Sequence, residues 1–384
     1  MRYVTLAIVI TLSASSAHAQ LPGGLTRRIG QAQEAKKKLD DLHFSDREER
    51  QLGEHISGRL IERFGVYQDV AVTRYVSLVG TILAQGSSRP NLRWEFIVLD
   101  TDGVNAYAAP GGLIHITRGA LGLMRTEAEL AGVLGHEVAH VIEKHTVDAI
   151  RKAHATELGT EFAARQSGDS GLTTEAVQRL GNAGYDVLFQ GRLDRGDEME
   201  SDKAGAALAH GSGYAPAGMI GFLTKVGERN KDMKEPNGLF ASHPQIRERI
   251  SAIEKAIREQ KLTATATVSG RYTGTITFEA KPASAIAMDI PGVRGAVGDS
   301  AAAPSTASGD GNAQKPAPPK KSGGLLGGIG SLTKGSQTKN SQTVASAGSR
   351  GGVPDRDATG GANKNKVRVT ISASDLAEFR KGIS

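Results

Sequence analysis

Two histidines and a glutamate lie within five residues of each other, at His136, Glu137 and His140. On an α-helix, residues at positions i and i+4 share one face, so both imidazoles can reach a single metal ion. Glu137 follows the first histidine directly and can take a proton from a water molecule on that metal as the water attacks an amide carbonyl. The pattern therefore predicts a metal-dependent hydrolase, with His136 and His140 as ligands and Glu137 as general base.

The segment around this group is apolar. From Thr126 to about Lys144 the pattern is helical and hydrophobic on most sides, which is typical of a buried helix. Two histidines and a glutamate in such a helix would be costly unless they were paired or bound to metal. The apolar surroundings therefore favour a metal site over a chance match.

A second acidic group supplies a candidate for the third ligand. Glu198 and Asp202 are separated by four residues in another helical segment, so both can face the metal helix, whereas Glu200 is expected to point elsewhere. Taken alone, this run would read as a solvated helix face. The chain contains no cysteine, so histidine and carboxylate must hold any metal, and a His/His/Glu set favours one Zn²⁺ per chain.

Four stretches, in this order, resemble a known family. They are residues 105–112, residues 135–145, residues 198–202, and His243-Pro244 followed by Arg249-Ile250. Over residues 44–258 the chain is similar to the zinc metallopeptidases that include the CAAX prenyl proteases, the Oma-type mitochondrial proteases, HtpX and the BepA-like periplasmic proteases. The absence of multiple membrane-spanning segments favours the soluble periplasmic branch.

The resemblance implies a role for each matching position. The zinc ligands would be His136, His140 and Glu198. Glu137 would be the general base and then the general acid toward the leaving amine, and Asp202 would orient a ligand histidine. One departure is Ser201, where the family usually has alanine.

The resemblance also implies that the strand Leu113–Thr117 pairs with an extended substrate by β-augmentation.

His243 is assigned to the catalytic set, with three readings left open. It could donate a hydrogen bond to the transition-state oxyanion, act as a fourth zinc ligand that closes the site and keeps it latent, or be a structural histidine before a proline turn. Arg249 could act beside it or serve on the helix surface. His145 is interpreted as a capping residue or as a partner of a ligand, rather than as a ligand itself.

The elements expected to position these residues give an α+β fold. Ser45 and Glu48 form a capping box for a helix that ends near Gly65, and a second helix is expected over residues 70–84. Strands are expected at residues 92–99 and 113–117. The result would be a mainly helical, gluzincin-like domain with a small β-sheet at the active-site cleft and a small C-terminal β element.

Composition divides the chain into six parts. We expect a signal peptide (1–19), an N-terminal helical segment (20–43), the metallopeptidase domain (44–258), a β-hairpin element (259–298), a disordered Gly/Ser/Pro/Lys linker (299–366) and a terminal strand and helix (367–384). The hairpin is placed at residues 263–278. The terminal strand, residues 367–371, is expected to pair with it, and Ser374 to cap the helix after it.

The N-terminus has the pattern of a secretory signal. Arg2 precedes an apolar run from Val4 to Leu12, and Ala17-His18-Ala19 offers a cleavage site. The alternative is a short membrane anchor. No later apolar run approaches ~20 residues, so no transmembrane segment is expected after signal removal. The predicted location is the periplasm, or alternatively the outside of the cell.

Charge gives no support for a nucleic-acid partner. The net charge is +6, but residues 299–366 hold nine Lys/Arg and four Asp/Glu, so most of the excess lies in the linker. No basic stripe with interleaved aromatic residues is present in the sequence, and no nucleic acid is expected as a partner.

Three functions remain open. The first is a zinc metalloendopeptidase that hydrolyses unfolded or misassembled exported proteins, with envelope or outer-membrane assembly proteins among its partners. The second is a chaperone-like or latent peptide-binding module that keeps the zinc site. The third is a zinc hydrolase of cell-wall peptides.

Overall fold

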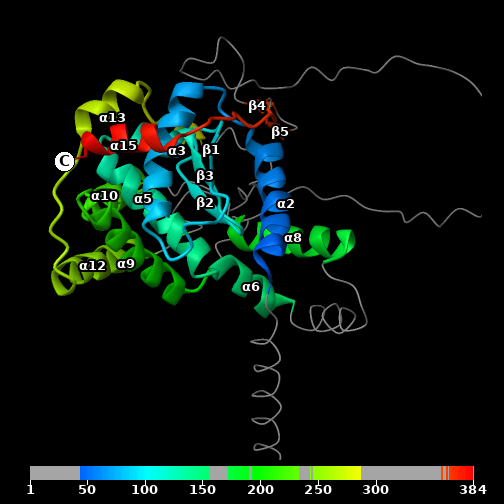
Figure 1. Cartoon of the computed structure of the whole chain (residues 1–384). Coiled ribbons are helices and arrows are strands. Elements are labelled where there is room, and N and C mark those ends of the chain that lie inside the picture. The colour runs from blue at the N-terminus through cyan, green and yellow to red at the C-terminus, as the bar shows by residue number, and fades with distance from the viewer. Residues whose placement is uncertain are drawn as a thin grey trace, which may run out of the picture.

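A three-stranded mixed sheet lies at the centre of the fold (Figure 1). The computed structural model describes residues 44–154, 172–189, 193–232, 243, 245–286, 356–357, 360–361 and 363–383. The strands are β1 (Glu95–Leu99), β2 (Ala106–Ala109) and β3 (Leu113–Thr117), in the spatial order β1-β3-β2. β1 runs parallel to β3, and β2 runs antiparallel to it.

The described helices cover both faces of this sheet or pack on the helices that do, which confirms the predicted α+β class of a mainly helical domain with a small sheet. They are α2 (Asp46–Phe64), α3 (Val70–Gln85), α4 (Arg118–Leu123), α5 (Glu127–Ile142), α6 (His145–Ala153), α8 (Thr174–Phe189), α9 (Arg195–Gly211), α10 (Gly218–Arg229), α12 (Ile246–Glu259), α13 (Ser269–Thr275), α14 (Ala283–Ile286) and α15 (Ala373–Lys381). None of the described helices is long and apolar enough to cross a membrane.

Alternation along the strands divides the core into two clusters. Phe96, Val98, Ile114 and Ile116 join the larger cluster, which is built mainly on α3, α5, α9 and α10. Ile97, Leu99 and Leu113, which alternate with them along the strands, contribute to a smaller cluster beneath α2 and α8. Successive side chains of a strand point to opposite faces, so a sheet with helices on both sides is buried on both.

Local capping fixes where the helices begin. Ser45 and Glu48 form the predicted capping box of α2, which ends at Phe64 before Gly65. Thr126 caps α5 by accepting a hydrogen bond from the backbone N–H of Glu129. These side chains satisfy backbone donors that lack partners in the first turn of a helix.

The predicted hairpin at residues 263–278 is wrong, because α13 occupies its centre. Tyr272 and Ile276 lie one helical turn apart, and both are buried in the main core. Thr273 and Thr275 bond back to carbonyls four residues earlier, so their hydroxyls are satisfied within the helical turn. Burial of an i, i+4 pair thus overrides the β preference of a threonine-rich segment.

The predicted terminal strand is also wrong. Residues 367–371 belong to no strand, and the helix that follows is capped by Ser372 rather than Ser374. Val367 and Ile371 pack against the two core clusters, so the alternation reflects burial on one side. Two short strands, β4 (Arg356–Asp357) and β5 (Gly360–Gly361), lie within the predicted linker instead.

The remaining sequence predictions on these flanks lie outside the described residues. They are the signal peptide, the segment 20–43 and the linker up to residue 355.

Candidate metal centre

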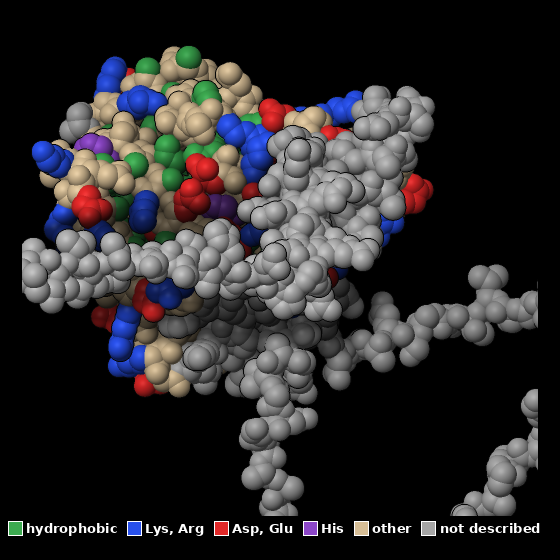
Figure 2. Space-filling model, turned by 90° about the horizontal axis from the view of Figure 1, so that it is seen from below, with side chains coloured by type: hydrophobic (Ala, Val, Ile, Leu, Met, Phe, Trp, Pro, Cys, Tyr) green, Lys and Arg blue, Asp and Glu red, His purple; other side chains and the backbone are tan. Residues whose placement is uncertain are grey.

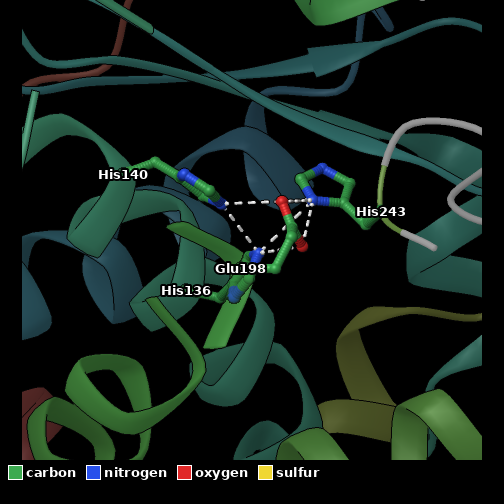
Figure 3. Close-up of side chains that lie close together, drawn as sticks. All are labelled: His136, His140, Glu198 and His243. Carbon is green, nitrogen blue, oxygen red and sulfur yellow. Dashed lines mark hydrogen bonds and ion pairs between the residues drawn. The ribbon is translucent and has the colours of Figure 1, made fainter. Parts of the chain in front are cut away.

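Four buried side chains from three parts of the chain meet at one point (Figure 3). His136 and His140 come from α5, Glu198 comes from the first turns of α9, and His243 lies just before α12. One ligand atom of each residue lies within 4.8 Å of the others. The spacing of the residues predicted this meeting for the first three. It left the place of His243 open.

The distances between these atoms suit a tetrahedral metal. Nε2 of His140 is 3.0 Å from Nε2 of His136 and 3.4 Å from a Glu198 oxygen. Nδ1 of His243 is 3.4 Å from Nε2 of His136 and 2.8 Å from both Glu198 oxygens. Zinc bonds of 2.0–2.2 Å at tetrahedral angles correspond to ligand separations of about 3.4 Å. The 3.4 Å separations match this value and the 3.0 and 2.8 Å separations are shorter, while the histidine and carboxylate donors fit zinc in chemistry.

The two facing ring nitrogens need either one shared proton or a cation between them. Neutral imidazole nitrogens with lone pairs pointing at each other at 3.0 Å would repel. Burial lowers the pKa of His136, but hydrogen bonds to Asp202 and Glu198 outweigh it and raise that pKa to about 9. Burial and the charge on His136 lower the pKa of His140 to about 3. The pocket thus stabilises one positive charge, which a metal ion can provide in place of the proton.

Asp202 and Arg249 hold His136 from the other side. Nδ1 of His136 is 2.9 Å from Oδ1 of Asp202, and Arg249 donates to both oxygens of Asp202 at 2.7 and 2.8 Å. Arg249 also lies 3.3 Å from Glu198. Burial raises the pKa of Asp202, but the charge of Arg249 outweighs it and holds that pKa below its usual range. A carboxylate that accepts from Nδ1 leaves Nε2 of His136 free to face the metal position.

Glu137 has the surroundings of a general base. Its carboxylate is buried, and neither oxygen has a hydrogen-bond partner among the residues that the structure describes. Burial raises its pKa above the usual value, and the neighbouring histidines partly offset this. Nε2 of His243 lies 3.9 Å from Oε1 of Glu137. An unpartnered buried carboxylate beside a metal position is suited to accept a proton from water.

A small pocket opens onto Glu137 and is bordered by β2. It is lined by Tyr107 and Ala108 of β2, Glu137, His140, His243, Val187 and Leu188 of α8, and Leu193. The strand beside the site is therefore β2.

On the lower face of the molecule, acidic and basic side chains are interspersed (Figure 2).

The prediction that Leu113–Thr117 pairs with substrate is wrong, because β3 is the central strand and has neighbours on both sides. β2 is an edge strand, and it is the one that reaches the pocket.

Arg249 proves more central than the sequence indicated. It is buried within the site, and its place in α12 could have pointed to this, because it shares the buried face of that helix with Ile246 and Ile253. A charged residue on an apolar stripe usually has a buried partner. Glu200 points away from the donor cluster, as predicted: its side chain is 60% exposed and lies 3.5 Å from Nε2 of His145.

Other histidines lie outside the centre. His115 is buried on β3 and hydrogen-bonds Ser57, and burial lowers its pKa to about 3. His210 accepts a hydrogen bond from the backbone of Ala264. His154 ends α6.

Known proteins resemble this chain over the same region. Residues 71–257 match the family model described as Peptidase family M48. The beta-barrel assembly-enhancing protease of Yersinia pestis is 27% identical over 208 residues, which are 52% of this chain and 41% of that protein. The mitochondrial metalloendopeptidase OMA1 of Schizosaccharomyces pombe is 27% identical over 190 residues, which are 50% of this chain and 54% of that protein. The metalloprotease LoiP of Escherichia coli is 29% identical over 150 residues, 39% of this chain and 57% of that protein. The chain thus spans less than half the length of the first of these relatives.

Proposed function

Residues 71–257 of this chain belong to peptidase family M48, and from that premise we propose that the protein is a zinc-dependent metalloendopeptidase. The observation that carries the proposal is the buried carboxylate of Glu137, which has no hydrogen-bond partner among the described residues and lies beside a four-donor cluster. A structural zinc site has no need of an unpaired base.

Each residue of the site is assigned one role in the proposed reaction. His136, His140 and Glu198 would hold the zinc, which when bound polarises water and the substrate carbonyl. Glu137 removes the proton from the attacking water and returns it to the leaving amine as the peptide bond breaks. Asp202, itself fixed by Arg249, keeps Nε2 of His136 directed at the metal position.

The proposed substrates are unfolded or misassembled exported proteins, including envelope assembly proteins. The edge strand β2 borders Glu137, so an extended chain can pair with backbone groups and be recognised with little dependence on sequence. The signal-like N-terminus supports a periplasmic location. The name of the Yersinia relative refers to β-barrel assembly, which we extend to this chain as part of the proposal.

The first test is cleavage of casein by the zinc-loaded protein and by its Glu137→Gln variant. We expect cleavage by the wild type and a loss of about 10²–10⁴-fold in the variant, because glutamine cannot accept the proton. Glu143→Gln, an exposed glutamate at the end of the same helix, is the matched control and should keep full activity. Chelation should abolish cleavage, and added zinc should restore it. Equal rates for Glu137→Gln and wild type would refute the proposed role.

A second candidate function, a latent or peptide-binding module, is favoured by the position of His243. Its Nδ1 lies within the donor cluster, and a fourth protein ligand would close the position that catalysis needs. His243→Ala separates the readings. A faster variant would support a latent fourth ligand, and a slower variant with unchanged zinc affinity would support a role in the transition state. A variant with lower Tm alone would support a structural role.

A further inference from the structure

A fourth histidine, His145, packs against the metal ligand His140, on the side of its ring that faces away from the donor cluster. Nδ1 of His145 is 3.0 Å from Nδ1 of His140, and the two rings are nearly perpendicular, with centroids 5.0 Å apart. His145 is 5% exposed. His145 contacts Nδ1 of His140, whereas Nε2 of His140 is the atom that faces His136 and Glu198. His145 therefore lies on the opposite side of the ring from the metal position.

A strained turn brings the two histidines together. In a continuous helix, a residue five positions later is rotated by about 140° from the first, so His145 could not face His140. α5 ends at Ile142 instead, and Lys144 adopts a left-handed conformation with φ of 61° before α6 begins at His145. The Lys144 ammonium lies 2.6 Å from the buried carboxylate of Glu49. Strain at a non-glycine residue persists where surrounding contacts hold it.

The hydrogen bonds permit only one proton arrangement when His140 is a metal ligand. A neutral histidine that binds metal through Nε2 carries its proton on Nδ1. That N–H points at Nδ1 of His145, which must therefore be the acceptor, and His145 carries its own proton on Nε2. The opposite tautomer would place two N–H donors 3.0 Å apart.

The surroundings of His145 match this tautomer on both sides. Nε2 of His145 is 3.5 Å from Oε2 of Glu200 and 3.9 Å from Oδ1 of Asp197, so carboxylates face the atom that carries the proton. The hydroxyl of Ser201 lies 3.2 Å from Nδ1 of His145, and as a rotatable group that can donate it is compatible with an acceptor at that atom. All three partners project from α9, the helix that also carries Glu198.

We propose that His145 is a positioning residue for the metal centre, which fixes the tautomer and ring orientation of His140 by accepting its Nδ1–H and is itself packed beside Glu200 and Ser201. The inference rests on the proposed zinc function for the ligand role of His140. His136 is oriented by Asp202 and His140 by His145, so both ligand histidines of α5 are held from α9. Partners of this kind set the orientation and basicity of a ligand, and their loss typically weakens metal binding 10- to 100-fold.

The test compares two substitutions in the full-length protein. In His145→Asn the amide oxygen can accept from Nδ1 of His140, whereas His145→Leu keeps the bulk but offers no acceptor. Zinc affinity is measured by competition with a chromophoric chelator at fixed pH. We expect about 10- to 100-fold weaker binding for the leucine variant and a loss of only a few-fold for the asparagine variant. Circular dichroism establishes that each variant is folded.

The matched control is His55→Leu, which replaces a histidine on α2 that bonds Asn182, outside the metal centre. It should bind zinc like the wild type. Wild-type affinity in His145→Leu would overturn the proposal. Equal losses in the leucine and asparagine variants would also overturn it, because they would show that packing, rather than the hydrogen bond, supports His140.

A spectroscopic measurement gives an answer that does not depend on the variants folding. In the zinc-loaded protein with ¹⁵N-labelled histidine, long-range ¹H–¹⁵N correlation distinguishes the tautomers. We expect His140 as the Nδ1–H form and His145 as the Nε2–H form, and a protonated Nδ1 on His145 would overturn the proposal. Neither readout uses proteolysis, so a protein that binds zinc but cuts nothing would refute the proposed function and leave this inference standing or falling by itself.

Discussion

At the scale of single residues, the stability of the metal centre depends on buried charged side chains that neutralise one another. The Arg249 guanidinium bonds both Asp202 and Glu198, and all three side chains are almost fully buried. Coulombic attraction in a low-dielectric interior offsets the cost of desolvating them only while each has its partner. Removing one member leaves an uncompensated charge in the core.

We therefore expect Arg249→Met to lower the free energy of unfolding by about 3–5 kcal/mol, measured by urea denaturation. Arg247→Met, an exposed arginine on the same helix, should change it by no more than about 0.5 kcal/mol. Equal stability of the two variants would mean that the carboxylates do not need the guanidinium. Zinc affinity should fall in the first variant only, because Asp202 would no longer be held against His136.

At the scale of elements, the distance between α5 and α9 sets the distance between the metal ligands. The helices touch at two glycines. A Cβ atom at Gly205 would lie 2.7 Å from the backbone nitrogen of His136, and one at Gly135 would lie 2.9 Å from the carbonyl of Gly205. Backbone atoms cannot rotate away as a side chain can, so any larger residue must separate the helices.

Gly205→Ala should push Glu198 away from His136 and His140. Overpacking of this kind costs about 1–3 kcal/mol of stability. We expect zinc affinity to fall about 10-fold or more, measured by the same chelator competition, since a ligand displaced from its bond length contributes little. Gly196→Ala is the matched control on α9, because its Cβ would meet nothing within 4 Å. Tight zinc binding by Gly205→Ala would contradict this account of the helix contact.

At the scale of the whole molecule, the C-terminal segment packs onto the start of the metal helix. Glu127, the first residue of α5, is buried and is bonded by Tyr75, Tyr214 and Arg271. Arg271 also donates to the carbonyl of Phe379 in α15 and lies over the ring of that residue. In Figure 1, α15 lies beside α3 and near α13, although most of the chain separates it from α3 in sequence.

Ending the chain at residue 362 should therefore destabilise the domain. Leu376 and Ile383 are buried, and losing their burial against the core costs roughly 1.5–3 kcal/mol each before relaxation. A net loss of about 3 kcal/mol corresponds to a fall of roughly 6–12 °C in Tm by calorimetry. A peptide of residues 363–384 should restore Tm when added in trans, and the same peptide with Phe379→Ala should restore less. An unchanged Tm would mean that the segment docks without stabilising the domain.

The features that depend on neighbours along the chain could be predicted from the sequence. The i, i+4 spacing of His136 and His140 and of Glu198 and Asp202, and the capping box of Ser45 and Glu48, act within one helical turn. The α+β class followed from the same periodicities. These predictions held because local geometry is nearly independent of the rest of the fold.

Tertiary structure decided which of these elements meet. Strand order made β3 central, and the side-chain pattern of a short buried strand does not reveal its neighbours. Burial of Tyr272 and Ile276 made a helix of the expected hairpin. Arg249 and His145 became part of the metal centre only because α9 brings Asp202, Glu200 and Ser201 against them. The energy of a buried charge or of a histidine tautomer depends on partners far away in sequence, and only the folded chain supplies them.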